Sequence, residues 1–119
     1  MILLDTNVFI YLANGSINAE QLNDDIAFAS VTKIEALGYS HITVAEQSYL
    51  EGLFVECEQI DLDESIIQRA IRLRQQVRLS LGDAIIAATA IENDCKLWTA
   101  NTEDFLHVEG LRLHNPLAK

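Results

Sequence analysis

The sequence contains little cysteine, which cross-links small folds, and little proline, which interrupts regular secondary structure. Its 119 residues include two cysteines, Cys57 and Cys95, and a single proline, Pro116. Neither cysteine has another Cys or a His nearby at metal-ligand spacing, so free thiols in a reducing compartment are expected, with a disulfide left open. The chain must therefore be held together by an ordinary hydrophobic core, which a domain of this length can form.

The sequence also lacks any segment suited to crossing or anchoring in a membrane. The longest apolar stretch, residues 84–91, is too short to span a bilayer. A signal peptide begins with basic residues and continues with a long apolar run. Residues 1–5 contain no basic residue, and the acidic Asp5 interrupts the apolar run early. We expect a cytoplasmic protein that does not associate with membranes.

Positive charge is scarce. Lys and Arg number 8 against 18 Asp and Glu, which gives a formal net charge of −10. Proteins that hold phosphates with their own side chains are usually basic, so this balance counts against simple nucleic-acid binding. It is compatible with a carboxylate-rich site that recruits divalent cations, which then meet the phosphate.

What is present is typical of one globular domain. Hydrophobic residues make up 50% of the chain and charged residues 22%. No repeat, low-complexity tract or linker divides residues 1–119, which predicts a single domain. Short apolar runs alternate with longer amphipathic segments, and this alternation favours an α/β fold around a parallel sheet.

The same alternation predicts where the elements lie. Strands are expected at residues 2–4, 26–29, 57–60, 96–100 and 111–113. Helices are expected at residues 7–13, 32–37, 43–54, 65–79 and 84–91. The helix at 65–79 has the clearest amphipathic stripe, and the helix at 84–91 is apolar on nearly every side, so it should be buried.

Acidic and amide residues follow the predicted strands. Asp5 follows the first strand, Glu35 lies in the helix after the second, and Asn101 and Asp104 follow the fourth, while Asp83 opens the apolar helix. Ligands in open α/β sheets bind beyond the carboxyl ends of the strands, so these groups should converge. Converging carboxylates repel one another unless cations compensate, and oxygen ligands suit Mg²⁺ or Mn²⁺. One or two such ions can activate water for phosphodiester cleavage.

Each acid also has a purely structural interpretation. Asp5 or Asn7 can cap the first helix, and Glu35 can complete a capping box that begins at Thr32. Asp83 can be the N-cap of the apolar helix, and Asp104 can cap a short turn. Spacing alone does not decide between these roles and a metal site.

Four segments carry residue patterns that occur together in one family. They are Leu3–Ile10 (LLDTNVFI), Ser30–Gly38 (SVTKIEALG), Leu81–Ala90 (LGDAIIAATA) and Trp98–Phe105 (WTANTEDF). In this order, spread over nearly the whole chain, they resemble the motifs of PIN-domain ribonucleases, and in particular the VapC-type toxins of toxin–antitoxin systems. Each segment alone is a weak signal, and the ordered set is a strong one.

The resemblance implies both a fold and an activity. The fold would be a three-layer α/β/α sandwich with a central parallel sheet of four to five strands. The activity would be Mg²⁺- or Mn²⁺-dependent endoribonuclease cleavage of RNA. Asp5, Glu35 and Asp83 match the core catalytic, metal-binding acids of the family, and Asp104 matches a fourth acid that varies more among relatives.

The resemblance also implies the lining of the pocket and the partners. Thr6, Asn7, Thr99 and Asn101 would line the pocket, and Asn101 stands where many relatives have Asp, so it would bind a cation only as a neutral group. Gly82 replaces a Pro that is common before the third acid, and Gly can make the same turn. The partners would be an RNA substrate, a small antitoxin protein that occupies the pocket, and a second copy of the chain in a homodimer.

Three other interpretations remain open. A phospho-accepting receiver domain has a similar fold, and Asp61 after the third strand suits it, but Asp5 lacks a second acid beside it and the last strand lacks a following Lys. A phosphohydrolase with an Asp nucleophile would need Asp in place of Asn7. A PIN fold kept only for binding would be expected to lose acids, and all four are present.

Two groups of residues could contact nucleic acid. The four arginines between Arg69 and Arg78 flank both sides of the apolar stripe, which favours solvated edges over one RNA-binding patch. Trp98 and Phe105 could stack on a base, but the position of Trp98 within a strand favours packing in the core.

Overall fold

A five-stranded parallel sheet forms the centre of the computed structural model, which describes residues 1–22 and 24–117. The strand order is β3-β2-β1-β4-β5. The strands are β1 (Ile2–Leu4), β2 (Ile26–Ala29), β3 (Glu58–Ile60), β4 (Lys96–Trp98) and β5 (Leu113–His114). From β1 the chain first adds β2 and β3 on one side, and it then adds β4 and β5 on the other side of β1. The junction of β1 and β4 is therefore the topological switch point, where ligands bind in sheets of this kind.

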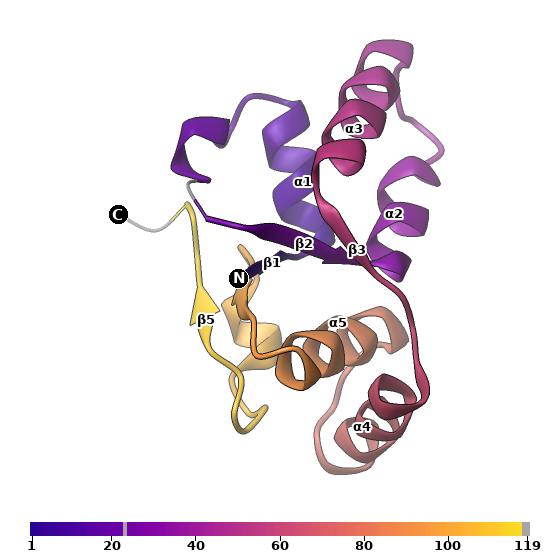
Figure 1. The fold of residues 1–119 in the computed structure, drawn as a ribbon, viewed down its shortest axis with the longest axis vertical. Helices are drawn as coiled ribbons and strands as arrows, with labels where there is room; N and C mark the ends of the chain where they lie inside the picture. The colour runs from indigo at the N-terminus through magenta and orange to yellow at the C-terminus, as the bar shows by residue number, and fades with distance from the viewer. Residues whose placement is uncertain (23, 118–119) are drawn as a thin grey trace.

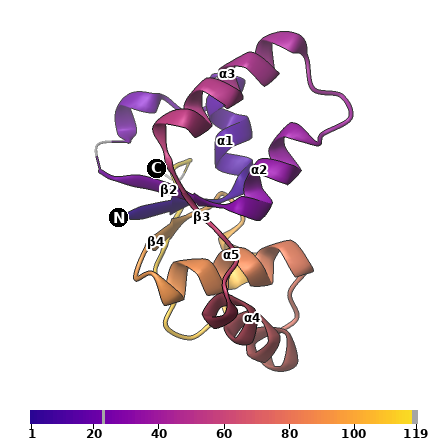
Figure 2. The same cartoon turned by 45° about the vertical axis from the view of Figure 1, so that its right-hand side comes forward.

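Helices cover both faces of the sheet and give three layers (Figure 1). The helices α1 (Thr6–Ala13), α2 (Ser30–Leu37) and α3 (Val44–Glu56) lie on one face, and α4 (Glu64–Gln76) and α5 (Leu81–Glu92) lie on the other. The turned view in Figure 2 places α2 and α5 on opposite sides of the sheet. The predicted α/β/α sandwich with a parallel sheet of four to five strands is confirmed.

The alternation of side chains along β1 builds two cores. Ile2 and Leu4 pack in the cluster under α1–α3, while Leu3, between them, packs in the cluster under α5. Successive side chains of a strand point to opposite faces, so a short apolar run supplies both layers. Phe9 and Phe54 pack with their ring centroids 4.6 Å apart in the first cluster.

Side-chain caps set several helix boundaries. The predicted capping box of α3 is present: the Thr43 hydroxyl accepts from the Glu46 backbone N–H, and the Glu46 carboxylate accepts from the Thr43 backbone N–H, both at 3.0 Å. Ser80 caps α5, so this helix begins at Leu81 and the prediction that Asp83 is its N-cap is wrong. Asp83 lies in the first turn instead.

Other predicted bounds were wrong by a few residues. The helix expected at 65–79 ends at Gln76, because Val77 takes an extended conformation with φ −131° and ψ 145°. The helix expected at 32–37 begins at Ser30, directly after β2, so Thr32 and Glu35 do not form a capping box. The fourth strand ends at Trp98, two residues short of the expected end at residue 100, and β5 covers Leu113–His114.

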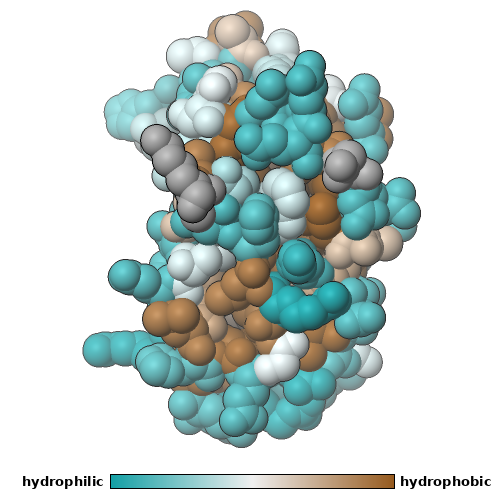
Figure 3. Space-filling view, turned by 90° about the vertical axis from the view of Figure 1, so that its left-hand side faces the viewer, coloured by the Kyte–Doolittle hydropathy of each residue, from teal (hydrophilic) through white to brown (hydrophobic). Residues whose placement is uncertain are grey.

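The described residues include two free thiols and a largely hydrophilic surface on one side of the molecule. Over residues 1–22 and 24–117, no helix has the length and apolarity that a transmembrane span requires. Cys95 is buried and Cys57 half-buried, and both are free. The face that carries β5 is mostly hydrophilic, with hydrophobic side chains gathered toward the layer of α4 and α5 (Figure 3).

Candidate active site

The site forms where β1 and β4 end side by side. The backbone N–H of Asp5 donates to the carbonyl of Trp98 at 2.9 Å, so the residues that follow these two strands are tied together. Asp5 comes directly after β1, and Thr99 comes directly after β4. Residues far apart in the sequence are thereby placed at one edge of the sheet.

Asp5 is the most enclosed of the acids, with 4% of its surface exposed. One carboxylate oxygen accepts from the backbone N–H of Thr6, and the other accepts from the Thr99 hydroxyl, both at 2.7 Å. Burial raises the pKa of Asp5, these two hydrogen bonds oppose the rise, and the negative charges of Glu35 and Asp104 add to it. Asp5 does cap α1, as the structural interpretation predicted, and the cap leaves it within reach of the other acids' charges.

Glu35 approaches the same place from α2. Its Oε1 accepts from the Thr6 hydroxyl at 2.7 Å. A Cβ atom on Gly82 would lie 2.8 Å from Oε2, closer than side chains tolerate. Gly82 therefore provides room for the Glu35 carboxylate, and the sequence-based reason for this glycine, backbone freedom in a turn, is not the one that the structure supports.

Asp83 lies on the opposite layer, in the first turn of α5. Burial raises its pKa from the ordinary 3.8 to about 6, and the charges of Asp5, Asp104 and Glu35 contribute to the rise against a hydrogen bond with Ser80. A carboxyl group that responds to three other carboxylates lies in their common field. The four predicted acids therefore form one electrostatic cluster built from both helical layers and the sheet.

Asp104 and Asn101 border this cluster on its β4 side. Asp104 lies in the short 3₁₀ helix η2 (Thr102–Phe105), and its charge raises the pKa of both Asp5 and Asp83. The backbone N–H of Asn101 donates to the Thr99 hydroxyl at 3.0 Å, and that hydroxyl donates to Asp5. Asn101 and Asp104 also line a polar hollow of about 280 Å³ together with Asn115.

Several other candidates lie outside the cluster. Among the described contacts, the side chain of Asn7 makes no hydrogen bond with the acids. Asp61 is exposed and accepts from Gln59 at 2.6 Å, without influence on Asp5 or Asp83. Phe105 has 1% of its surface exposed, so it cannot stack on a base, and Trp98 is buried beside the His114 ring.

Two of the four arginines make contacts that involve none of the predicted acids. Arg69 pairs with Glu92 at 2.8 Å, and Arg74 donates to the Leu79 carbonyl at 3.4 Å. These contacts agree with the prediction of solvated helix edges.

Sequence reasoning missed three residues of the site. Thr32, which is fully buried, has its hydroxyl 3.2 Å from the Thr6 hydroxyl. Ser80 accepts from the backbone N–H of Asp83 at 3.1 Å, and the spacing Ser80-x-x-Asp83 is a capping signal that could have revealed it. Asn115 comes from the segment after β5, and no local pattern marks it.

The donor set fits a hard divalent cation. The candidate ligands are carboxylate groups, which repel one another when ionised. The groups that influence the pKa of Asp83 include no Cys or His. In the part of the chain that the structure describes, no three His, Cys, Asp or Glu side chains converge on one metal position. Mg²⁺ commonly uses one or two carboxylates and keeps several waters, so a tighter cage is not required.

Comparison with known proteins identifies the family. The family model described as PIN domain matches residues 2–111. This chain belongs to the PIN domain family. Membership of this family excludes the interpretations as a receiver domain and as a phosphohydrolase with an Asp nucleophile. The acid cluster of this PIN domain lies at the topological switch point of its sheet. No curated protein sequence matches the chain significantly.

Solved structures extend the comparison over the whole PIN domain. A chain from a toxin–antitoxin complex of Klebsiella pneumoniae is 29% identical, with a TM-score of 0.79 and 98% of both chains covered. A chain from VapBC2 of Rickettsia felis bound to a promoter DNA fragment is 26% identical, with a TM-score of 0.84, and 97% of this chain and 98% of that chain are covered. A chain from DNA-bound VapBC of Salmonella typhimurium shares the fold at 19% identity, with a TM-score of 0.85 and coverage of 98% of this chain and 99% of that chain.

Proposed function

We propose that this PIN domain is a metal-dependent endoribonuclease, and that Asp5, Glu35, Asp83 and Asp104 hold the metal and carry the reaction. The observation that supports this best is that Thr6 donates to both Asp5 and Glu35 at 2.7 Å, while Gly82, beside Asp83, lies against the Glu35 carboxylate. Grouping four acids is unfavourable without a compensating charge. A cation between the acids and a phosphodiester would supply that charge.

The chain's own residues would divide the work. Asp5 is fixed by two hydrogen bonds and would give one ligand of constant position. Glu35 and Asp83, from the two helical layers, and Asp104 and Asn101, from the β4 side, would bind the cation directly or through its water molecules. Mg²⁺ or Mn²⁺ bound there would lower the pKa of a bound water and stabilise charge on the leaving oxygen. The cation would also let an acidic protein bind RNA.

The test is cleavage of total RNA by the purified protein with Mg²⁺, with Mn²⁺ and with EDTA, beside Asp83→Asn. We expect discrete fragments that disappear with EDTA and with the variant. Absence of cleavage by folded protein, combined with no effect of either cation on its melting temperature, would favour a PIN fold that serves only for binding.

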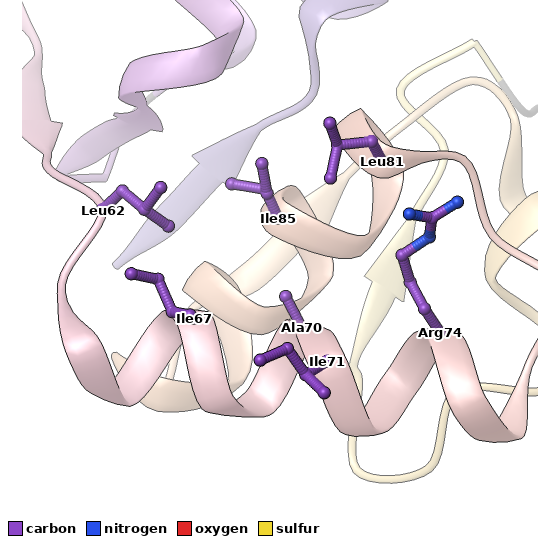
Figure 4. Close-up of a pocket in the computed structure, with 7 residues that line it drawn as sticks. All are labelled: Leu62, Ile67, Ala70, Ile71, Arg74, Leu81 and Ile85. Carbon is purple, nitrogen blue, oxygen red and sulfur yellow. The ribbon is translucent and has the colours of Figure 1, made fainter.

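We further propose that the protein is the toxin of a toxin–antitoxin pair. The similar chains from Klebsiella pneumoniae and Rickettsia felis come from a toxin–antitoxin complex and from VapBC2. An apolar groove of about 240 Å³ between α4 and α5 suits such a partner (Figure 4). Leu62, Ile71 and Leu81 line it with 45%, 47% and 61% of their surfaces exposed.

Leu81 in the groove and Asp83 in the acid cluster both lie in the first turn of α5. An antitoxin segment with apolar residues at helical spacing would fill the groove. Coexpression with a candidate antitoxin should give a stable complex that does not cleave RNA. Leu81→Asp should disrupt that complex, and an unchanged complex would contradict the assignment of the groove.

A homodimer is part of the same proposal. Light scattering of the purified chain should give twice the 13.3 kDa mass of one copy. A monomer across the accessible concentration range would contradict it.

A further inference from the structure

A hydroxyl group with no ligand role lies beneath the acid cluster. Thr32, on α2, has 0% of its surface exposed. Its Oγ1 lies 3.2 Å from Oγ1 of Thr6, which in turn lies 2.7 Å from Oε1 of Glu35. A chain of three side chains from two helices therefore runs from the core to the acid.

The direction of the hydrogen bonds in this chain follows from proton counting. A hydroxyl has one proton to donate, and an ionised carboxylate only accepts. Thr6 therefore donates to Glu35, and Thr32 must donate to Thr6. Each bond polarises the next, which strengthens the hydrogen bond that reaches the carboxylate.

Glu35 needs such support because its residue lies on the exposed side of α2. A long side chain in contact with water populates several rotamers, and holding it in one costs conformational entropy. The Thr6 hydroxyl fixes one oxygen of the carboxylate, and the close approach of Gly82 limits where the other can lie. The carboxylate is therefore confined on two sides.

The structure offers a contrasting threonine in Thr89. It is also buried in a helix, with 1% of its surface exposed, and its hydroxyl donates to the Ile85 carbonyl one turn earlier at 2.7 Å. That local bond is the ordinary use of a helical threonine. The Thr32 hydroxyl instead contacts a side chain of α1, so its position links two elements.

We propose that Thr32 is a positioning residue that acts through Thr6 to hold Glu35 in the rotamer that binds the cation. The effect of Thr32 on cation binding rests on the proposed function, but the orientation of Glu35 can be measured without metal or RNA. Thr32 itself touches neither cation nor substrate.

The decisive experiment measures the χ1 couplings of Glu35 by NMR in the metal-free protein. The variants are Thr32→Val, which removes the hydroxyl and keeps the shape, Thr32→Ser, which restores it, and Thr89→Val as a matched control. We expect a single Glu35 rotamer in the wild type, in Thr32→Ser and in Thr89→Val, and averaged couplings in Thr32→Val. Unchanged couplings in Thr32→Val, or averaging already in the wild type, would overturn the proposal.

A second measurement connects orientation to binding. Mn²⁺ affinity, followed by electron paramagnetic resonance, should fall about tenfold in Thr32→Val and recover in Thr32→Ser, as for other groups that orient metal ligands. In RNA cleavage kcat should fall while KM stays constant. A wild type that binds no Mn²⁺ contradicts the proposed function, whereas the couplings still decide the role of Thr32. If Thr32→Val does not fold, Thr32→Cys keeps a small side chain with only a weak donor and replaces it in both measurements.

Discussion

Asp5 and Asp83 carry the same carboxyl group in different surroundings. Asp5 accepts two hydrogen bonds that partly offset its burial, whereas Asp83 has one hydrogen-bonding partner, Ser80, and repulsion from three other acids. Burial, and after it the repulsion, raises the pKa of Asp83 to about 6, so its ionisation at neutral pH opposes folding. The raised pKa of Asp83 therefore lowers the stability of the metal-free fold at neutral pH.

Asp83→Asn should stabilise the metal-free protein at pH 7.5. Because the folded-state pKa of about 6 exceeds the ordinary value of 3.8, the contribution of Asp83 to stability falls as pH rises through this range. After discounting for solvent screening, we expect a gain of about 1 kcal/mol, or roughly 4 °C in Tm, less any loss at the helix N-terminus. Thermal melts in EDTA at pH 7.5 and pH 4 measure it, and the gain should vanish at pH 4. An equal gain at both pH values would contradict the repulsion.

Gly82→Ala should impair activity without unfolding the protein. The new Cβ would lie 2.8 Å from Oε2 of Glu35, and this flexible carboxylate can move away at low cost to stability. A displaced ligand should reduce the cleavage rate by ~10- to 100-fold. Gly52→Ala in α3 is the matched control, because nothing lies within 4 Å of its Cβ position. It should raise stability by about 0.5–1 kcal/mol and leave cleavage unchanged.

At the scale of elements, α4 shows how one amphipathic helix serves two surfaces. Ile66, Ala70 and Leu73 are buried against the sheet and α5, while Ile71 has 47% of its surface exposed in the apolar groove. All four lie within residues 65–79, where the sequence predicted the clearest amphipathic stripe. Part of the stripe builds the core, and its exposed edge lines the apolar groove.

Truncation along α4 should separate these two roles. Ile66→Ala removes a fully buried side chain and should cost roughly 2–4 kcal/mol of unfolding free energy. Ile71→Ala should cost less than about 1 kcal/mol, because its side chain already meets water. Urea unfolding of both variants measures the difference. Equal costs would mean that Ile71 is covered in solution, for instance by a second copy of the chain.

At the scale of the whole molecule, the net charge of −10 and the position of the acids determine how the protein responds to salt. Monovalent salt screens the general repulsion of an acidic surface. A divalent cation held by the cluster would add a specific stabilisation that depends on its concentration.

MgCl₂ should raise Tm more than KCl at equal ionic strength. At a free Mg²⁺ concentration about 100 times its Kd, the added stability would be about 2.7 kcal/mol. Asp83→Asn should lose most of this difference while keeping the response to KCl. Equal responses of the wild type to both salts would contradict a metal site at the cluster.

The sequence predicted the elements better than the contacts between them. All five strands and five main helices were expected, because short apolar runs and amphipathic stripes are local patterns. The misplaced ends, such as Val77 and Leu81, depend on a backbone conformation and on a Ser80 cap that propensity did not decide. The acids were predicted because four local motifs resemble one family. The contact of Thr32 with Thr6 of α1 and the position of Asn115 after β5 were missed, because both depend on packing between elements.

The sequence by itself determined the α/β class, the parallel sheet, the acidic charge and the identity of the acids, since each follows from residue type and local spacing. Only the tertiary structure decided which groups meet. It gave Asp5 the hydroxyl of Thr99, 94 positions away, set Gly82 against Glu35, and joined Thr32 to Thr6. Such contacts depend on how parallel strands order themselves and how helices pack across a sheet, which no local pattern encodes.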